Sequence, residues 1–178
     1  MDNSYLNIND IQKIVSKDLN YVNDIIIDNI GNEIPLINDL SKHILASGGK
    51  RIRPIITLLT SSICNYSGKN HLPLAACVEF IHTATLLHDD VIDESKLRRG
   101  TATANEIFGN KTSILVGDFL FSRAFELMVK NGSKKILKIL SKASSTIAQG
   151  EVLQLTTIND CSITKELYMK IIKNKTAS

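Results

Sequence analysis

The sequence predicts an all-α helical bundle, and three observations support that fold class. The 178-residue chain contains three prolines and nine glycines, so few positions interrupt a helix. Apolar residues recur at steps of three and four, the spacing of one helix face, and no long stretch alternates between apolar and polar residues. Hydrophobic residues make up 43% of the chain, which is enough for one domain with a packed core.

Seven helical segments are expected, each supported by apolar residues at helical spacing. They run from Ile8 to Ile26, from Leu36 to Ile44, over about 52–64, from near Pro73 to about Ile92, over about 112–129, over about 133–158, and from near Thr164 onward. Gly48-Gly49 and Ser67-Gly68 are typical helix stop signals. Pro54 is expected near the start of the third segment, because proline suits the first helical turn.

A polar loop is expected at about 95–110, where Arg98-Arg99-Gly100-Thr101 interrupts the helical pattern. The chain shows no internal repeat, low-complexity tract or linker, so residues 1–178 are interpreted as part of a single domain. No helix stop signal precedes Ala177-Ser178. We therefore expect this end of the chain to lie in the middle of an element.

Charge, hydropathy and cysteine content exclude several classes of protein. The net charge of +3 is too small and too diffuse to indicate nucleic-acid binding. The apolar runs are short, so no transmembrane helix is expected, and the N-terminus has no secretory signal pattern. Cys64, Cys77 and Cys161 lie far apart without a CxxC spacing. They indicate reduced thiols in the cytoplasm and argue against a zinc site.

Asp89-Asp90-Val91-Ile92-Asp93 is the most informative stretch, because it follows an apolar helical run. A helix advances about 100° per residue, so Asp89 and Asp93 lie one turn apart on one face. Two such carboxylates repel each other unless a cation lies between them, and Mg²⁺ accepts one or two carboxylates together with water and phosphate oxygens. The alternative is an exposed acidic helix end, which the helix macrodipole disfavours. The pattern therefore predicts a metal site.

Three basic segments are candidate contacts for an anion. The loop 48–54 carries Lys50 and Arg53, and its glycines would let the backbone approach a diphosphate, although the P-loop spacing is absent. Arg98-Arg99-Gly100 and Lys175-Thr176 are the other two segments. Each of the three is an ordinary basic surface in the alternative reading. Taken with the acidic stretch, they predict a site for polyanionic phosphates that carry apolar tails.

Further polar residues are candidates for the same site. His82 precedes Asp89 by seven residues, two turns along one stripe, although a single histidine is more often part of a packed core. Asp118 and Gln149-Gly150-Glu151 are candidates for lining the cavity, because carboxylates and amides among apolar helices need partners. A position on the helix surface is the alternative for both.

Five segments follow one another in a recognisable order. They read GGKRIRP, VEFIHTATLLHDDVIDESKLRRGTATAN, LVGDFLFSRAF, GEVLQL and KTAS. In these segments the chain resembles the trans-type polyprenyl diphosphate synthase family, in particular its long-chain, octaprenyl-type branch, and the resemblance runs from about residue 5 to the last residue. The block that joins DDxxD to RRG is the most specific. The resemblance implies an all-α bundle of the isoprenoid synthase type, usually homodimeric.

The resemblance also implies a role for individual residues. Mg²⁺, which bridges to the allylic diphosphate, would be held by Asp89 and Asp93. Isopentenyl diphosphate would be bound by Lys50, Arg53, His82 and Arg99. The allylic diphosphate would be contacted by Arg98 and by the KT motif, Lys175 and Thr176.

The implied reaction adds isopentenyl diphosphate to an allylic diphosphate by head-to-tail 1'-4 condensation. The allylic C–O bond ionises, isopentenyl diphosphate attacks the cation and a proton is lost, giving an all-trans polyprenyl diphosphate of the kind used for isoprenoid and quinone side chains. In short-chain relatives, bulky residues near positions 84 and 85 block the growing chain. Ala84 and Thr85 are small, so we expect a product longer than geranylgeranyl, around octaprenyl.

One family feature is missing from this sequence, the second aspartate-rich motif. Asp89-Asp90 is the only adjacent pair of aspartates, and after Glu151 the only acids are Asp160 and Glu166. The chain ends just after the KT motif, so the C-terminal half that closes the bundle is expected to be absent. A gene fragment or split frame, an artificially shortened chain, or a subunit completed by another chain would explain this. We expect the isolated chain to be inactive or nearly so.

Two other classes of function remain as alternatives. One is a partner-dependent, non-catalytic subunit of a heteromeric prenyl synthase, against which the retained Asp89 and Asp93 argue. The other is an HD-type metal phosphohydrolase, because His88-Asp89 is the dipeptide of that class. Such a site needs further ligands on other helices, and the remaining histidines, at 43, 71 and 82, do not follow that pattern.

Overall fold

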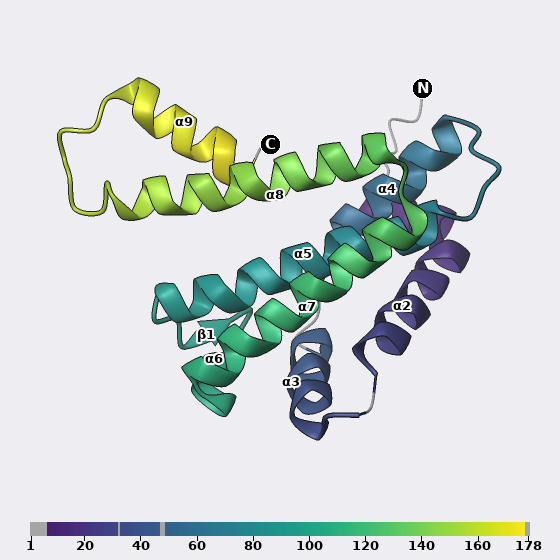
Figure 1. Ribbon diagram of the computed structural model, residues 1–178, viewed down its shortest axis with the longest axis horizontal. Coiled ribbons are helices and arrows are strands. Elements are labelled where there is room, and N and C mark those ends of the chain that lie inside the picture. The colour runs from purple at the N-terminus through teal and green to yellow at the C-terminus, as the bar shows by residue number, and fades with distance from the viewer. Residues whose placement is uncertain (1–6, 32, 47–48, 177–178) are drawn as a thin grey trace. The chain divides into compact units, whose positions relative to one another are not determined.

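The computed structural model describes residues 7–31, 33–46 and 49–176, and the chain divides into two compact units, Met1–Asn131 and Gly132–Ser178 (Figure 1). The first unit contains α1 (Ile8–Ile14), α2 (Ser16–Ile30), α3 (Pro35–Ala46), α4 (Ile52–Ile63), α5 (His71–Ile92), β1 (Leu97–Arg98), β2 (Thr101–Ala102), α6 (Ala104–Phe108) and α7 (Asn110–Asn131). The second unit contains α8 (Lys134–Leu155) and α9 (Lys165–Thr176). Every long element is a helix, which confirms the predicted all-α class.

Helices α5 and α7 form the centre of the first unit. They run side by side in opposite directions, and α2 and α4 pack against α5 (Figure 1). Fully buried Ala75, Ala76 and Ala124 let the helix backbones approach one another closely. The Sγ of buried Cys77 donates to the carbonyl oxygen of Ala124 at 3.5 Å, and burial raises the pKa of this thiol to about 12. Burying a leucine such as Leu87, which is 2% exposed, contributes roughly 1.5–3 kcal/mol.

The N-terminal helical segment differs from the prediction. The segment expected from Ile8 to Ile26 is two helices, because Val15 leaves the helical conformation (φ −107°, ψ 12°) and α2 begins at the next residue. Val15 is buried, so its apolar side chain kept the helical spacing intact across the break. Helix α3 ends at Ala46, close to the expected stop at Gly48-Gly49, of which Gly48 lies outside the described residues.

The expected loop at 95–110 is wrong in part, because it contains a short hairpin and the helix α6. Strands β1 and β2 pair antiparallel. The two residues between them, Arg99 and Gly100, have φ values of 54° and 80°, as the two central residues of a type I′ turn do. Two-residue strands are too short to show an alternating pattern in the sequence.

The second unit is an antiparallel pair of helices, α8 and α9 (Figure 1). The Oγ of Ser133 accepts the N–H of Ile136 at 3.3 Å and caps the start of α8. Helix α8 ends at Leu155, a few residues before the expected end. At Gly150 the backbone of α9 comes so close that a Cβ atom would lie 2.8 Å from the Lys175 nitrogen. The glycine therefore sets the distance between the two helices.

Neither a membrane span nor a disulfide is found in the part of the chain that the structure describes. None of its helices is both long and apolar enough to cross a bilayer. The three thiols are free, and two of them are exposed: Cys64 at the end of α4 and Cys161 between α8 and α9. The element expected to continue through Ala177-Ser178 lies outside the described residues.

Candidate functional site

The acidic stretch of the sequence forms the end of α5. Asp89 is half-buried and Asp93 is exposed. The N–H of Asp93 donates to the carbonyl oxygen of Asp89 at 2.8 Å, so the two carboxylates belong to residues one helical turn apart. Asp93 is also the C-terminal cap of the helix. Their role as metal ligands stays a prediction.

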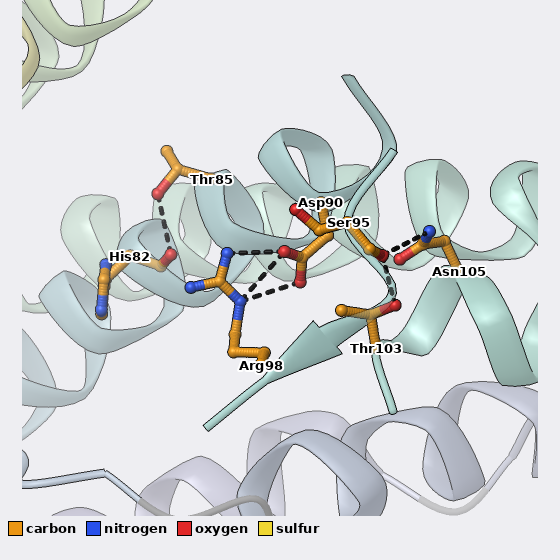
Figure 2. Close-up of polar contacts among 7 residues, drawn as sticks. All are labelled: His82, Thr85, Asp90, Ser95, Arg98, Thr103 and Asn105. Atoms are coloured by element: carbon orange, nitrogen blue, oxygen red, sulfur yellow. Dashed lines mark hydrogen bonds and ion pairs between the residues drawn. The ribbon is translucent and has the colours of Figure 1, made fainter. Parts of the chain in front are cut away.

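Asp90 lies between these two residues and has a different partner. Its side chain is 6% exposed, and its carboxylate accepts from Arg98 Nε at 2.9 and 3.0 Å and from Arg98 Nη2 at 2.5 Å (Figure 2). The hydrogen bond to Asp90 is the main reason why the pKa of Arg98 is raised, and burial acts in the opposite direction. Such a two-pronged contact fixes the plane of a guanidinium. The expected contact of Arg98 with the allylic diphosphate stays a prediction.

The hairpin that carries Arg98 is tied to the end of α5. The carbonyl oxygen of Ser95 accepts from Thr103 Oγ1 at 2.7 Å and from Asn105 Nδ2 at 3.1 Å (Figure 2). The N–H of Ser95 donates to the carbonyl oxygen of Asp90 at 2.9 Å. These bonds pair the hydroxyl of Thr103 and the Nδ2 of Asn105, two buried residues, whereas the Oδ1 of Asn105 has no hydrogen-bond partner among the described residues. They hold the hairpin against the acidic helix end.

One open pocket of the first unit, with a volume of about 630 Å³, brings together four predicted residues from three separate segments. They are Lys50, Arg53, His82 and Arg99. Lys50 comes from the loop before α4 and Arg53 from the first turn of α4, whereas α5 supplies His82 and the hairpin tip supplies Arg99. The other lining residues are Gly49, Arg51, Ile52 and Glu79. Four cationic side chains and one acid thus surround the pocket, which gives it the charge that an anion requires.

The loop that leads into α4 is held from two sides. Arg51 caps this helix in a left-handed conformation (φ 49°, ψ 35°), which costs a residue other than glycine roughly 1–3 kcal/mol. Arg51 Nη1 lies 2.6 Å from Oε1 of Glu79 on α5, with side chains that are 19% and 9% exposed. Gln12 Nε2 donates to the carbonyl oxygen of Lys50 at 3.1 Å.

The hairpin tip also reaches this loop. A Cβ atom built on Gly49 would lie 3.0 Å from Arg99 Nη1, which is closer than a side chain normally comes. The glycine therefore lets the Arg99 guanidinium lie against the loop backbone. The two distant basic segments are therefore in close contact at one edge of the pocket.

His82 is neutral at physiological pH. The pKa of its imidazole is lowered to about 4, mainly by burial and also by Arg53 and Arg99, while Glu79 acts in the opposite direction. A neutral imidazole has one N–H donor and one acceptor nitrogen. His82 therefore brings a directed hydrogen-bonding group to the cationic pocket and adds no charge.

Ala84 and Thr85 lie on α5 before the acidic segment. Ala84 is 1% exposed, and half-buried Thr85 donates through Oγ1 to the carbonyl oxygen of His82 at 2.8 Å (Figure 2). Neither residue lines the pocket described above. That these two small residues leave an open path for a long product stays a prediction.

The KT motif lies in the second unit, at the end of α9. Lys175 Nζ donates to Glu151 Oε2 at 2.8 Å and to Gln154 Oε1 at 3.1 Å, both on α8. Thr176 is exposed. Within this unit, the lysine predicted to contact the allylic diphosphate is held by α8 through one acid and one amide.

The metal prediction depends on two carboxylates rather than on a complete cage. No group of three or more His, Cys, Asp or Glu side chains that could hold a metal ion is found among the described residues. Asp89 and Asp93 nevertheless fit a hard divalent cation that takes its other ligands from water and phosphate. His88, the histidine of the hydrolase alternative, lies with its Nε2 3.2 Å from the carbonyl oxygen of Ile114 and 3.4 Å from Oδ1 of exposed Asp118.

Two residues of this region were missed by sequence reasoning, Glu79 and Arg51. Glu79 interrupts the apolar run 74–81, and a buried carboxylate needs a partner, so this signal was present in the sequence. Arg51 looked like part of an ordinary basic loop, and its commitment to Glu79 is visible only in the structure.

Comparisons of the sequence and of the structure with known proteins point to one family, and the matches cover most of the chain. The family model for "Polyprenyl synthetase" matches residues 34–178. The octaprenyl diphosphate synthase of Escherichia coli is 50% identical over 172 residues, covering 97% of this chain and 53% of that protein. The crystal structure of a decaprenyl diphosphate synthase from Rhodobacter capsulatus superposes with a TM-score of 0.93 at 45% identity, covering 96% of this chain and 53% of that one.

A second solved structure carries bound groups. It is a polyprenyl synthase from Caulobacter crescentus complexed with calcium and isoprenyl diphosphate, with a TM-score of 0.91 and 46% identity. The match covers 95% of this chain and 52% of that one. The chain therefore spans about half the length of the relatives it matches.

Proposed function

The chain belongs to the polyprenyl synthetase family, and from this premise we propose that it forms the N-terminal half of a synthase that makes a long-chain trans-polyprenyl diphosphate. The observation that carries this proposal is the pocket that unites Lys50, Arg53, His82 and Arg99. On the same helix as His82, Asp89 lies in the last turn and Asp93 caps the C-terminal end. Isopentenyl diphosphate and an allylic diphosphate are the proposed substrates.

The pocket is proposed to bind isopentenyl diphosphate. Lys50, Arg53 and Arg99 would hold the diphosphate by charge-assisted hydrogen bonds. His82, being neutral, would donate or accept one directed hydrogen bond. Binding the diphosphate in this way keeps the apolar end of the molecule free to meet the allylic partner.

The allylic diphosphate is proposed to bind at the acidic end of α5, with Arg98, Lys175 and Thr176 as further contacts. A divalent cation, proposed to be Mg²⁺, would be held there by Asp89 and Asp93 and would neutralise charge on the leaving diphosphate. The calcium ion in the Caulobacter crescentus relative supports a divalent metal in this family. Arg98 would offer its remaining N–H donors in a fixed orientation, because its ion pair with Asp90 holds the guanidinium.

The product is proposed to be about as long as octaprenyl. The relatives named above are octaprenyl and decaprenyl synthases, and small residues at positions 84 and 85 support an open path for a growing chain. The active form is proposed to be a homodimer or a complex with a chain that supplies the other half. We place it in the cytoplasm as part of the same proposal, because its described cysteines are free thiols.

A chimera tests this function. Residues 1–178 joined to the C-terminal half of the Escherichia coli relative should elongate an allylic diphosphate with isopentenyl diphosphate in the presence of Mg²⁺. The double change Asp89→Ala and Asp93→Ala should lower kcat/KM by roughly 100-fold or more. The matched control is Asp10→Ala, which removes an acid whose side chain contacts its neighbours Lys13 and Asn7 at the start of the chain and should change kcat/KM less than twofold.

Two results of this experiment would count against the proposal. A folded chimera that makes no prenyl product would remove the assigned reaction. Full activity in the double variant would remove the metal role of the two acids. The 178-residue chain alone is expected to be nearly inactive, and mixing it with a chain that carries the missing half should restore turnover.

A non-catalytic subunit is the second candidate, favoured by the half-length match to the relatives. It differs from the main proposal in one measurable way. A subunit of that kind would bind a longer synthase chain and raise its activity, and the double change at Asp89 and Asp93 would leave this activation unaltered. If the Asp89→Ala and Asp93→Ala double variant no longer raised the activity of the longer chain, the non-catalytic role would be excluded.

A further inference from the structure

The loop before α4 and the helix α5 are joined by one buried ion pair that no predicted substrate contact explains. Arg51 Nη1 and Glu79 Oε1 lie 2.6 Å apart, although the two residues are 28 positions apart in the sequence. Arg51 follows Lys50 directly and precedes Arg53 by two residues. The position of Arg51, the N-terminal cap of α4, therefore affects where Lys50 before it and Arg53 in the first turn of the helix can lie.

The backbone of Arg51 shows that this position is held from outside. Its φ of 49° is a left-handed conformation that side-chain-bearing residues rarely adopt. Such a conformation persists when surrounding contacts over-determine it. The ion pair is the side-chain contact that ties this residue to α5, and the bond from Gln12 to the carbonyl oxygen of Lys50 supports the same loop.

Glu79 also carries the wrong charge for an anion pocket. Among the described residues that line the pocket it is the one acid, and it is 7% exposed. An unpaired carboxylate in this place would repel a diphosphate. Arg51 neutralises it, so the charge of Lys50, Arg53 and Arg99 remains available for the ligand.

We propose that Arg51 and Glu79 are positioning residues of the diphosphate pocket, and that their ion pair holds Lys50 and Arg53 in the same pocket as His82 and Arg99. This inference rests on the proposed function, because it assumes that the pocket binds a diphosphate. It assigns different tasks to the two arginines at the start of α4: Arg53 contacts the ligand, and Arg51 binds α5. Neither Arg51 nor Glu79 touches the substrate.

Charge arithmetic makes the proposal testable with a single change. Glu79→Gln removes a negative charge from a pocket that binds an anion. If Glu79 were only a background charge, the change would tighten the binding of inorganic diphosphate. If Glu79 positions the loop, the change releases Arg51 together with Lys50 and Arg53, and binding weakens.

The experiment titrates inorganic diphosphate into the 178-residue chain by calorimetry, at fixed ionic strength and without divalent metal. We expect Glu79→Gln and Arg51→Gln each to raise the Kd at least tenfold. The double variant, which carries both changes, should have a Kd no higher than that of the weaker-binding single variant, because the same ion pair is lost in all three proteins. Arg51→Lys, which keeps the charge, should recover binding to within about threefold of the original chain.

The matched control is Glu126→Gln on α7. Glu126 pairs with Arg123 at the same 2.6 Å, but its side chain is 64% exposed, and its loss should leave the Kd unchanged. Hydrogen exchange separates a positioning role from a general loss of stability. The amides at the start of α4 should exchange faster in Glu79→Gln, whereas those in the middle of α7 should not.

Each outcome counts for or against the inference. Unchanged or tighter diphosphate binding in Glu79→Gln overturns the inference and leaves the proposed function standing. Absence of diphosphate binding in the original chain overturns both. If Glu79→Gln does not fold, as judged by circular dichroism, the Kd values of Arg51→Gln and Arg51→Lys decide, and equal weakening in both overturns the inference.

Discussion

Two acidic residues on α5 are buried and ion-paired. Asp90 and Glu79 are 5% and 7% exposed, and each is paired with an arginine from one of the two basic segments. A buried carboxylate is costly without a partner. Arg98 therefore pairs with Asp90, and Arg51 pairs with Glu79. Each basic segment thus commits one arginine to α5 and places a neighbouring cation at the pocket.

A pH titration tests the environment of His82. An unfolded histidine has a pKa near 6.5, whereas the folded value is about 4. Between pH 6.5 and pH 4, His82 is protonated in the unfolded chain and stays neutral in the folded chain. The free energy of unfolding should therefore decrease as the pH falls from 6.5 toward 4. Above pH 7 both forms are neutral, and this residue adds no pH dependence.

The measurement compares urea unfolding of the original chain and His82→Gln at pH 7, 6 and 5. The decrease in unfolding free energy between pH 7 and 5 should be smaller in the variant, because its side chain does not titrate. The charged groups that act on His82 are Arg53, Glu79, Arg99 and Arg98, and all four remain in the variant. Equal pH dependence in both proteins would contradict the assignment.

Some of the candidate site could be predicted from the sequence because it depends on local geometry. The spacing of Asp89 and Asp93 is a property of one helix, and so is the position of His82 two turns earlier. The pairing of Arg51 with Glu79 depends on how two helices pack, which no local pattern contains. The approach of Arg99 to Gly49 likewise joins residues 50 positions apart.

At the level of elements, long helices were predictable and short irregular pieces were not. The 22-residue helices α5, α7 and α8 repeat the apolar spacing many times, so the pattern stands out. The break at Val15 was hidden because this residue is apolar and buried on either interpretation. The hairpin depends on a left-handed Arg99, a conformation that composition does not favour.

The packing of α8 against α9 gives a prediction at this scale. Gly150→Ala would place a methyl group 2.8 Å from the Lys175 nitrogen and 3.0 Å from the carbonyl carbon of Asn174. Because these are backbone atoms, α9 has to move away. We expect the free energy of unfolding of this unit to decrease by about 1–2 kcal/mol. Overpacking costs about 1–3 kcal/mol, and alanine recovers part of this cost through its higher helix propensity.

Hydrogen exchange of the α9 amides measures this effect. Faster exchange is expected along α9 in Gly150→Ala, with little change in the first turns of α8. Ser145→Ala is the control, because Ser145 is an exposed residue of the same helix and the change should cost nothing. Protection of α9 that is equal in both variants would show that the close approach at Gly150 is unimportant.

For the molecule as a whole, the first unit assembles the anion pocket from three segments of its own. The loop, α5 and the hairpin all lie before residue 132, so diphosphate binding should be a property of this unit. The KT motif belongs to the second unit, where α8 holds its lysine. Substrate turnover should therefore require both units, whereas occupation of the pocket should not.

Product length is the prediction that belongs to the complete enzyme. In the chimera, Thr85→Phe and Ala84→Phe should each shorten the prenyl chain, because a bulky ring would block its path along α5. Thr85→Phe is the cleaner variant, since Thr85 is half-buried, whereas a ring at fully buried Ala84 adds an overpacking cost of about 1–3 kcal/mol. Thr60→Phe, at an exposed position of α4, is the control.

Mass spectrometry of the products decides this prediction. The control should keep the product of the original chimera, and the two variants should stop at shorter lengths. A chain length that is the same in all four proteins would contradict the path along α5. A chimera that itself stops at farnesyl or geranylgeranyl diphosphate would contradict the proposed long-chain product.

The distribution of thiols has a practical consequence. Cys77 is sealed between α5 and α7, and its high pKa keeps it protonated, so a maleimide dye would leave it untouched. Cys64 and Cys161 are exposed, one in each unit. A donor and an acceptor dye on these two positions would report the distance between the units by energy transfer, with and without inorganic diphosphate.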